Sequence, residues 1–224
     1  MNSKDTLTHQ PAPCGLIASE RVWPYLVIGD ETVIDALRQK GHVSRALAHG
    51  RQEAASIRRS HPDQGARAVL SILDVEIVES DEDPKIAWRY RRSEYSRRPP
   101  RVTIYRKALP EIAGLAAEAG LGAVFPEKVV GELALAHELY HHIALTTSGR
   151  VSNHCRIAWI ELGPLKLRRR IPALDEVAAQ AFAQAFVGAS LPPTVLDWLT
   201  VYRDPERFEA CVRRAERLVE LHRL

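Results

Sequence analysis

The 224-residue sequence has few of the features that mark secreted, membrane-spanning or disulfide-bonded proteins. Its three cysteines, Cys14, Cys155 and Cys211, are far apart and form no Cys-x-x-Cys pair, so neither a disulfide framework nor a zinc ribbon is expected. The N-terminus has no apolar run of signal-peptide length, and the chain has no uncharged apolar stretch of roughly eighteen residues. We therefore expect a cytoplasmic protein that does not interact with membranes.

The chain also has little excess charge of either sign, because its formal net charge is only +3 at pH 7. That excess alone does not imply a polyanionic partner. The segment Arg89–Arg106, RYRRSEYSRRPPRVTIYR, nevertheless holds seven arginines and three tyrosines, which could contact nucleic acid through phosphates and stacked bases. The alternative is a solvated pair of strands, since Ile86, Trp88 and Tyr90 alternate with residues that would face water.

The hydrophobic spacing predicts an α+β fold, with a small sheet embedded among helices. With 46% hydrophobic residues, a chain of this length can form a core without a metal or a disulfide, so any metal site is free to be catalytic. We expect a flexible tail over residues 1–20, a helical segment over 21–73 and the main domain over 74–224.

The individual elements are predicted from the same spacing. Strands are expected over residues 75–78, 85–91 and 102–105, and an extended piece over 156–167 that is interrupted by Gly163-Pro164. Helices are expected over residues 30–40, 43–60, 63–73, 109–120, 127–147, 173–189, 193–201 and 205–222.

One helical segment, VVGELALAHELYHHIAL, contains an H-E-x-x-H motif formed by His137, Glu138 and His141. Histidines four residues apart on a helix differ by about 40° in direction, so both imidazoles face one point, with Glu138 on the same side. Two imidazole nitrogens and a nearby carboxylate that is not a ligand are what a catalytic zinc takes from a single helix. The surrounding residues are apolar, and an ionised Glu138 among them would cost several kcal/mol unless it were paired or close to a metal.

A catalytic zinc needs a third protein ligand and an open fourth position. The collagenase-type extension is absent, because Ala144 and Thr147 occupy the positions of its glycine and third histidine. The best donor is Glu176 in IPALDEVAAQAFAQAFVG, at the start of an alanine-rich helix that can approach another backbone closely. Asp175 is the alternative donor, although its position suits a first-turn or capping role.

The two segments together resemble the ImmA/IrrE-type metallopeptidase domain, over roughly residues 70–190. The second motif of that family is commonly written Glu-x-Glu-Ala-Asn-x-Phe-Ala. The matching residues are Glu176, Ala179, Phe182 and Ala183, whereas Ala178 replaces the second acidic residue and Gln180 replaces the asparagine.

The resemblance implies a zincin-like core in which His137, His141 and Glu176 bind Zn²⁺ and Glu138 is the catalytic base. It also implies a protein or peptide substrate, which in several members of the family is a helix-turn-helix repressor. The segment VTIYRKAL is similar to the family's edge strand, along which an extended substrate could pair. The insert over residues 108–128 is longer than is typical of the family.

The sequence therefore predicts a zinc-dependent peptidase that hydrolyses a peptide bond with metal-activated water. Spacing does not identify the group that stabilises the oxyanion, and Tyr140, His142 and His154 are the candidates. The alternative is a regulatory or binding protein with a structural or vestigial metal site and a nucleic-acid-contacting, arginine-rich surface. An intact Glu138 favours the peptidase, because a closed structural site does not need it.

Overall fold

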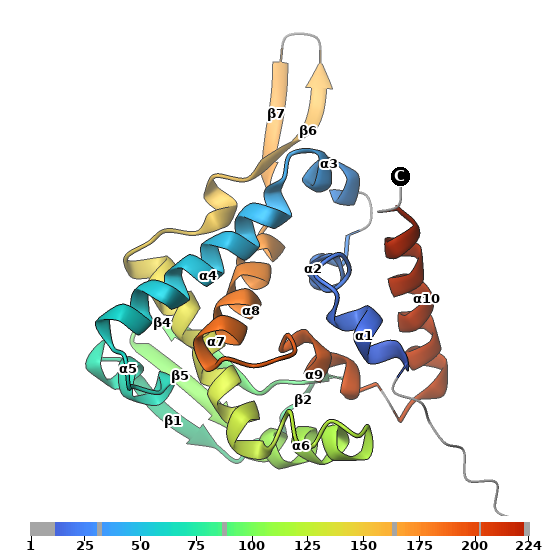
Figure 1. Cartoon of the computed structure of the whole chain (residues 1–224). Helices are drawn as coiled ribbons and strands as arrows, with labels where there is room; N and C mark the ends of the chain where they lie inside the picture. Colours follow the sequence, from blue (N-terminus) through green and yellow to red (C-terminus); the bar gives the residue numbers. More distant parts are fainter. Residues whose placement is uncertain (1–11, 31–32, 87–88, 163–164, 202, 222–224) are drawn as a thin grey trace, which may run out of the picture.

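The computed structural model describes residues 12–30, 33–86, 89–162, 165–201 and 203–221. In these ranges the chain has the predicted α+β class, with small sheets embedded among helices (Figure 1). No helix in the described ranges is long and apolar enough to span a bilayer.

Ten α-helices and one 3₁₀ turn are described. They are α1 (Ala12–Ala18), α2 (Trp23–Ile28), α3 (Ile34–Gln39), α4 (His42–Ser60), α5 (Ala66–Ile72), α6 (Ala108–Glu118), α7 (Glu127–Thr146), η2 (Val151–Asn153), α8 (Ala173–Val187), α9 (Thr194–Leu199) and α10 (Pro205–Leu221). The described strands are β1 (Glu76–Ser80), β2 (Lys85–Ile86), β3 (Arg89–Tyr90), β4 (Ser93–Arg97), β5 (Pro100–Tyr105), β6 (Arg156–Leu162) and β7 (Leu165–Arg170).

The N-terminal region is more ordered than the sequence predicts. Residues 12–18 form α1, and Ile17 is buried in the core, so the flexible tail expected over residues 1–20 is wrong for this part. Residues 1–11 lie outside the described ranges. Helix α2 was also not predicted, because a six-residue helix that begins at Trp23-Pro24 and ends at Gly29 is too short to show a helical period.

The main sheet has the strand order β1-β5-β4, with β1 parallel and β4 antiparallel to β5. The segment VTIYRKAL therefore contains a central strand, and its expected role as the edge strand is wrong. Val102 and Ile104 of β5 are buried, as a central position requires. The edge strand beside α7 is β4, whose sequence Ser-Glu-Tyr-Ser-Arg is too polar to have been recognised as a strand.

The single strand expected over residues 85–91 is also wrong. Strand β2 pairs antiparallel with β3, so this segment is a short hairpin. The apolar residues of the two short strands follow one alternating pattern along the sequence. That pattern therefore does not reveal that the chain reverses direction between β2 and β3. Residues 87–88, including the expected core residue Trp88, lie outside the described ranges.

The alanine-rich helix α8 packs against α4 on one side and against α7 on another (Figure 1). Ala178, Ala179, Ala181 and Ala183 are buried, which confirms the close approach that their small side chains allow. A single hydrophobic core includes side chains from α4, α7 and α8, so the helical segment expected over residues 21–73 shares its core with the rest of the chain.

The α4–α8 contact generates a stability prediction at Gly50. A Cβ atom at this position would lie 2.2 Å from the carbonyl oxygen of Ala178, which is backbone and cannot move aside. We expect Gly50→Ala to lower the free energy of unfolding by at least about 1–3 kcal/mol, as overpacking of a core does. Urea titration followed by circular dichroism measures this change.

Gly114 of α6 provides the matched control, because a Cβ there would meet nothing within 4 Å. Gly114→Ala should raise the free energy of unfolding by about 0.5–1 kcal/mol, the usual gain in a helix. Equal effects of the two substitutions would contradict the close α4–α8 packing.

Candidate metal centre

Helix α7 carries the H-E-x-x-H motif through the middle of the protein. Most of its apolar side chains are buried, and among its polar side chains Glu138 and His142 are only 5% and 7% exposed. His137 and His141 are partly exposed and lie on the side that faces α8. The motif therefore lies on a helix that is covered almost all round, as the apolar sequence around it predicts.

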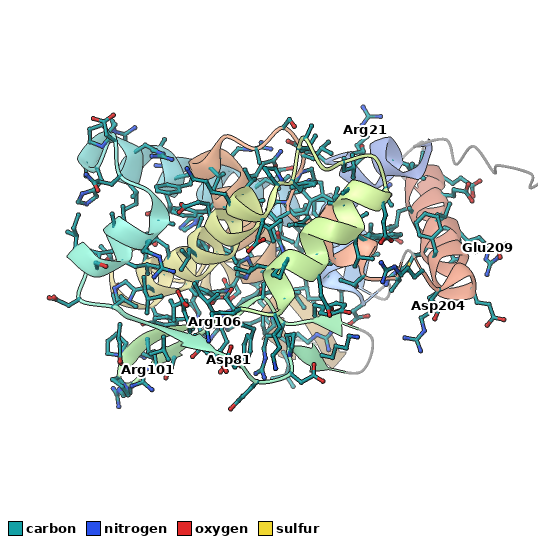
Figure 2. All side chains as sticks on the ribbon, turned by 90° about the horizontal axis from the view of Figure 1, so that it is seen from below. Arg21, Asp81, Arg101, Arg106, Asp204 and Glu209 are labelled. Atoms are coloured by element: carbon teal, nitrogen blue, oxygen red, sulfur yellow. The ribbon has the colours of Figure 1, made fainter. Side chains whose placement is uncertain are left out.

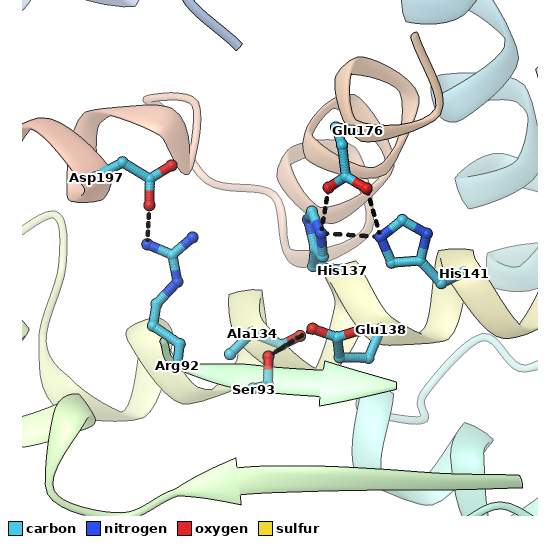
Figure 3. A network of polar contacts seen from close by, with 8 residues as sticks. All are labelled: Arg92, Ser93, Ala134, His137, Glu138, His141, Glu176 and Asp197. Carbon is cyan, nitrogen blue, oxygen red and sulfur yellow. Dashed lines mark hydrogen bonds and ion pairs between the residues drawn. The ribbon is translucent and has the colours of Figure 1, made fainter. Parts of the chain in front are cut away.

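The structure brings the three predicted ligands together (Figure 3). The two histidine Nε2 atoms are 3.1 Å apart, and the Glu176 carboxylate oxygens lie 3.2 Å from Nε2 of His137 and 3.4 Å from Nε2 of His141. Ligands at the usual 2.0–2.1 Å from a tetrahedral zinc are separated from one another by about 3.3 Å. The three side chains could therefore hold a metal ion with little rearrangement.

The Glu176 carboxylate and His141 stabilise each other's charged forms. Burial by itself raises the pKa of the Glu176 carboxyl, but hydrogen bonds to His137 and His141 outweigh it and bring that pKa well below the ordinary value. Burial lowers the pKa of His141, and the hydrogen bond to Glu176 reverses this, so that the pKa of His141 lies above its ordinary value. A carboxylate facing two imidazoles is a donor set that suits zinc.

Asp175, the alternative ligand, is turned away from the cluster. Its carboxylate is buried and accepts hydrogen bonds from the backbone N–H of Ser152 at 2.9 Å and from the Ser152 hydroxyl at 2.7 Å. The residue stands in the first turn of α8, as expected, but it caps the η2 turn. Glu176, and not Asp175, is therefore the carboxylate that faces the two histidines.

Glu138 lies beside the ligand cluster but is not part of it. Its Oε1 accepts a hydrogen bond of 2.8 Å from the hydroxyl of Ser93, which comes from the edge strand β4 (Figure 3). Sequence reasoning missed Ser93, because nothing marks a single serine in an arginine-rich segment before β4 is placed against α7.

The three candidates for an oxyanion-stabilising group are engaged elsewhere. Tyr140 is buried and pairs with Nδ1 of His49 at 3.3 Å, and His142 pairs with the hydroxyl of Tyr95 at 2.9 Å. His154 lines a different cavity. Arg150, which the sequence does not single out, is the one arginine among the described residues that line the cleft beside the cluster.

Three cavities in the described part of the chain border Glu176, and two of them are much larger than the third. The first is a cleft of about 390 Å³ between α7 and β4, lined by Ser93, Glu94, Tyr95, His137, Glu138, His141, Leu145, Arg150 and Glu176. The second measures about 370 Å³ and has apolar walls that include Leu26 and Trp198. Gln180 and Thr194 also line this second cavity, and their buried side-chain oxygens have no hydrogen-bond partner. Both cavities are large enough for parts of a bound molecule.

The arginine-rich segment 89–106 is largely neutralised by acidic neighbours. Arg92 forms an ion pair of 2.8 Å with Asp197, and Arg106 pairs with Asp81 on the sheet (Figures 2 and 3). Arg91 pairs with Glu94 and Arg101 with Glu76. Most of the positive charge that suggested nucleic-acid contact is therefore paired within the protein.

Removal of the Glu176 carboxylate should abolish tight metal binding. We expect Glu176→Ala to lower zinc affinity by more than the roughly 10–100-fold loss caused by removing an outer partner of a ligand. Asp175→Asn is the control, because it leaves the three ligand atoms in place. Zinc content after dialysis, measured by plasma emission spectroscopy, distinguishes them, and equal loss in both variants would contradict the assignment of Glu176.

The metal-free protein should be most stable in mildly acidic solution. The raised pKa of His141 gives a contribution that is complete below about pH 6.5, the ordinary value for histidine, and is lost as the pH rises through the raised value. The lowered pKa of Glu176 gives a contribution that is present above about pH 4.3 and is lost as the pH falls through the lowered value.

The free energy of unfolding in a chelator should therefore be largest between about pH 4.3 and pH 6.5. Urea titrations that extend below and above this range measure it, and Glu176→Gln should flatten both slopes. An unchanged slope above about pH 6.5 in that variant would show that other groups cause the dependence.

Comparison with protein-family models, with curated proteins and with solved structures finds no match to this chain. The resemblance to the ImmA/IrrE-type domain, with the zincin-like core that it implies, therefore stays a prediction.

Proposed function

We propose that this protein is a zinc-dependent peptidase with a zincin-like core. The observation that carries the proposal is the tetrahedral spacing of His137, His141 and Glu176, with the separate carboxylate of Glu138 beside them. A zinc ion held by the three ligands would polarise a peptide carbonyl and acidify a water molecule. The three ligands come from two helices and border an open cleft, so a bound zinc ion would keep a side that substrate can reach.

Glu138 would act as the general base and acid. It lies in the same cleft as the ligands but outside their cluster, so its carboxylate is free to accept a proton from water and to return it to the leaving amine. The Ser93 hydroxyl donates to Oε1 and holds the carboxylate in one orientation. Arg150, at the wall of the cleft, is the cation that could stabilise developing negative charge on the peptide oxygen.

The substrate would be a protein or peptide in an extended conformation. Strand β4 pairs with β5 on one side, and among the described strands nothing pairs with its other side, which borders the cleft. An extended peptide could add there by main-chain hydrogen bonds. The cavity lined by Gln180 and Thr194 would receive a side chain that can satisfy their unpaired oxygens. A helix-turn-helix repressor, the substrate implied by the resemblance, belongs to this class.

The alternative function, a nucleic-acid-binding protein with a vestigial metal site, has less support. Its arginine-rich surface is largely ion-paired, with Arg97 and Arg98 exposed at the turn between β4 and β5. A vestigial site would also not require the buried Glu138 and its hydrogen bond to Ser93.

Glu138→Gln should separate metal binding from catalysis. The amide cannot accept the proton, so we expect unchanged zinc content and a loss of kcat/KM of about 10²–10⁴-fold. Hydrolysis of fluorescein-labelled casein and of a pool of quenched-fluorescence peptides measures the loss. Ser93→Ala should cost less, about 10–100-fold, as removal of an orienting partner does.

Glu127→Gln is the matched control, since Glu127 is an exposed carboxylate in the first turn of the same helix. Its activity should equal that of the unsubstituted protein. Retention of more than about a tenth of that activity by Glu138→Gln would contradict the proposed role of Glu138.

A further inference from the structure

A strongly basic cavity of about 360 Å³ lies away from the metal centre. It is formed at the first turn of α4 and the base of the β6–β7 hairpin, which extends from the helical body beside α3 (Figure 1). Its lining consists of Lys40, His42, Arg45, Asn153, His154, Arg156 and Arg168. None of these described lining residues is acidic, so at least four permanent positive charges surround one small volume.

The cations of this cavity differ from the other arginines of the hairpin. Arg169 forms an ion pair of 2.9 Å with Asp30, and Arg170 donates to the hydroxyl of Ser152 at 3.0 Å. By contrast, among the side chains that the structure describes, which do not include those of residues 159–166, no carboxylate pairs with Arg156 or Arg168. Like charges held around one cavity repel one another, and a bound anion would remove that cost.

His42, a buried residue of the cavity lining, holds Arg45 in place. Nε2 of His42 donates to the carbonyl oxygen of Arg156 at 3.3 Å, because a carbonyl can only accept. Nδ1 then accepts from Arg45 Nη1 at 3.5 Å, because a guanidinium can only donate. Arg45 also donates to the carbonyl oxygen of Lys40 at 3.2 Å. The guanidinium is therefore pre-positioned at the cavity.

The start of α4 adds to the same positive field. Gly41 precedes the helix in a left-handed conformation with φ of 61°, and no side chain caps the first turn. The N-terminus of a helix carries a partial positive charge, and α4 has 19 residues. The positive end of this helix dipole lies at the cavity, where His42 is the first residue of α4, and adds to the charge of the four cations.

We propose that this cavity binds a compact ligand that carries two or more phosphate groups. Arginine matches phosphate oxygens with paired hydrogen bonds, and several negative charges within a small volume balance several cations better than the single charge of a peptide carboxylate does. The ligand is a free polyphosphate or a nucleotide held through its phosphates. Because the described lining has no Phe, Tyr or Trp on which bases could stack, single-stranded nucleic acid fits less well.

Calorimetric titration of the full chain with tripolyphosphate at low salt tests the proposal. Because tripolyphosphate also binds zinc, the titration is repeated in the Glu176→Ala background, where the metal centre cannot contribute heat. Binding should be the same in both, and it does not depend on peptidase activity. We expect Arg156→Gln combined with Arg168→Gln to weaken binding at least about 30-fold, since two charge-assisted contacts are lost.

Arg97→Gln combined with Arg98→Gln is the charge-matched control, on an exposed turn far from the cavity in sequence. It should change affinity less than about 3-fold, as a remote change of two charges does in screened solution. Should the hairpin variant fail to fold, Lys40→Gln, at the exposed turn between α3 and α4, repeats the test.

Further titrations identify the source of the phosphates. Similar binding of ATP and tripolyphosphate, with none of adenosine, supports recognition of phosphate alone, and tighter binding of ATP supports a nucleotide. Equal weakening by both double variants, or binding of sulfate as tight as that of tripolyphosphate, would overturn the proposal. So would tighter binding of a twelve-nucleotide single-stranded DNA than of tripolyphosphate, which would assign the surface to nucleic acid.

Discussion

The close approach of α8 to α7 is the contact on which the metal centre depends. His137 and His141 come from one helix and Glu176 from the other, so the donor distances of 3.1–3.4 Å exist only while the two backbones keep their spacing. Alanine side chains allow that spacing, and α4 supports α8 from another side, where Gly50 lies against Ala178. Displacement of a ligand by about 1 Å is enough to spoil a site of this kind.

The two glutamates of the site are placed in different surroundings, which suit the two roles proposed for them. Glu176 is half-exposed and faces two imidazoles, which hold it ionised and aim both of its oxygens at the position of a cation. Glu138 is buried and is hydrogen-bonded to the neutral hydroxyl of Ser93. A carboxylate held outside the ligand cluster but inside the same cleft would be able to exchange protons, as proposed for Glu138, while the three ligands kept hold of a metal ion.

The sequence predicts the helices and the ligands better than it predicts the sheet. A helical period fixes the relative direction of His137 and His141, so their convergence follows from their spacing. Spacing does not decide between Asp175 and Glu176. Adjacent helical side chains differ by about 100° in direction, and the way α8 crosses α7 decides which of the two reaches the histidines. Strand β4 and Ser93 were missed for a related reason. An edge strand with one side open to solvent has no apolar pattern, and its position is set by its partner β5.

Asp175 and Glu176 also connect the metal centre to the basic cavity. The Asp175 carboxylate holds Ser152 by two hydrogen bonds, and the next residues in the chain, Asn153 and His154, line that cavity. Glu176 follows Asp175 in the same helical turn and belongs to the ligand cluster. Asp175 is buried and accepts both hydrogen bonds, so it ties the η2 turn to the first turn of α8, which carries Glu176. The basic cavity lies beside the η2 turn, and the cluster of His137, His141 and Glu176 lies beside the turn of α8. An anion bound to Asn153 or His154 would therefore contact a turn that is hydrogen-bonded to the residue next to Glu176.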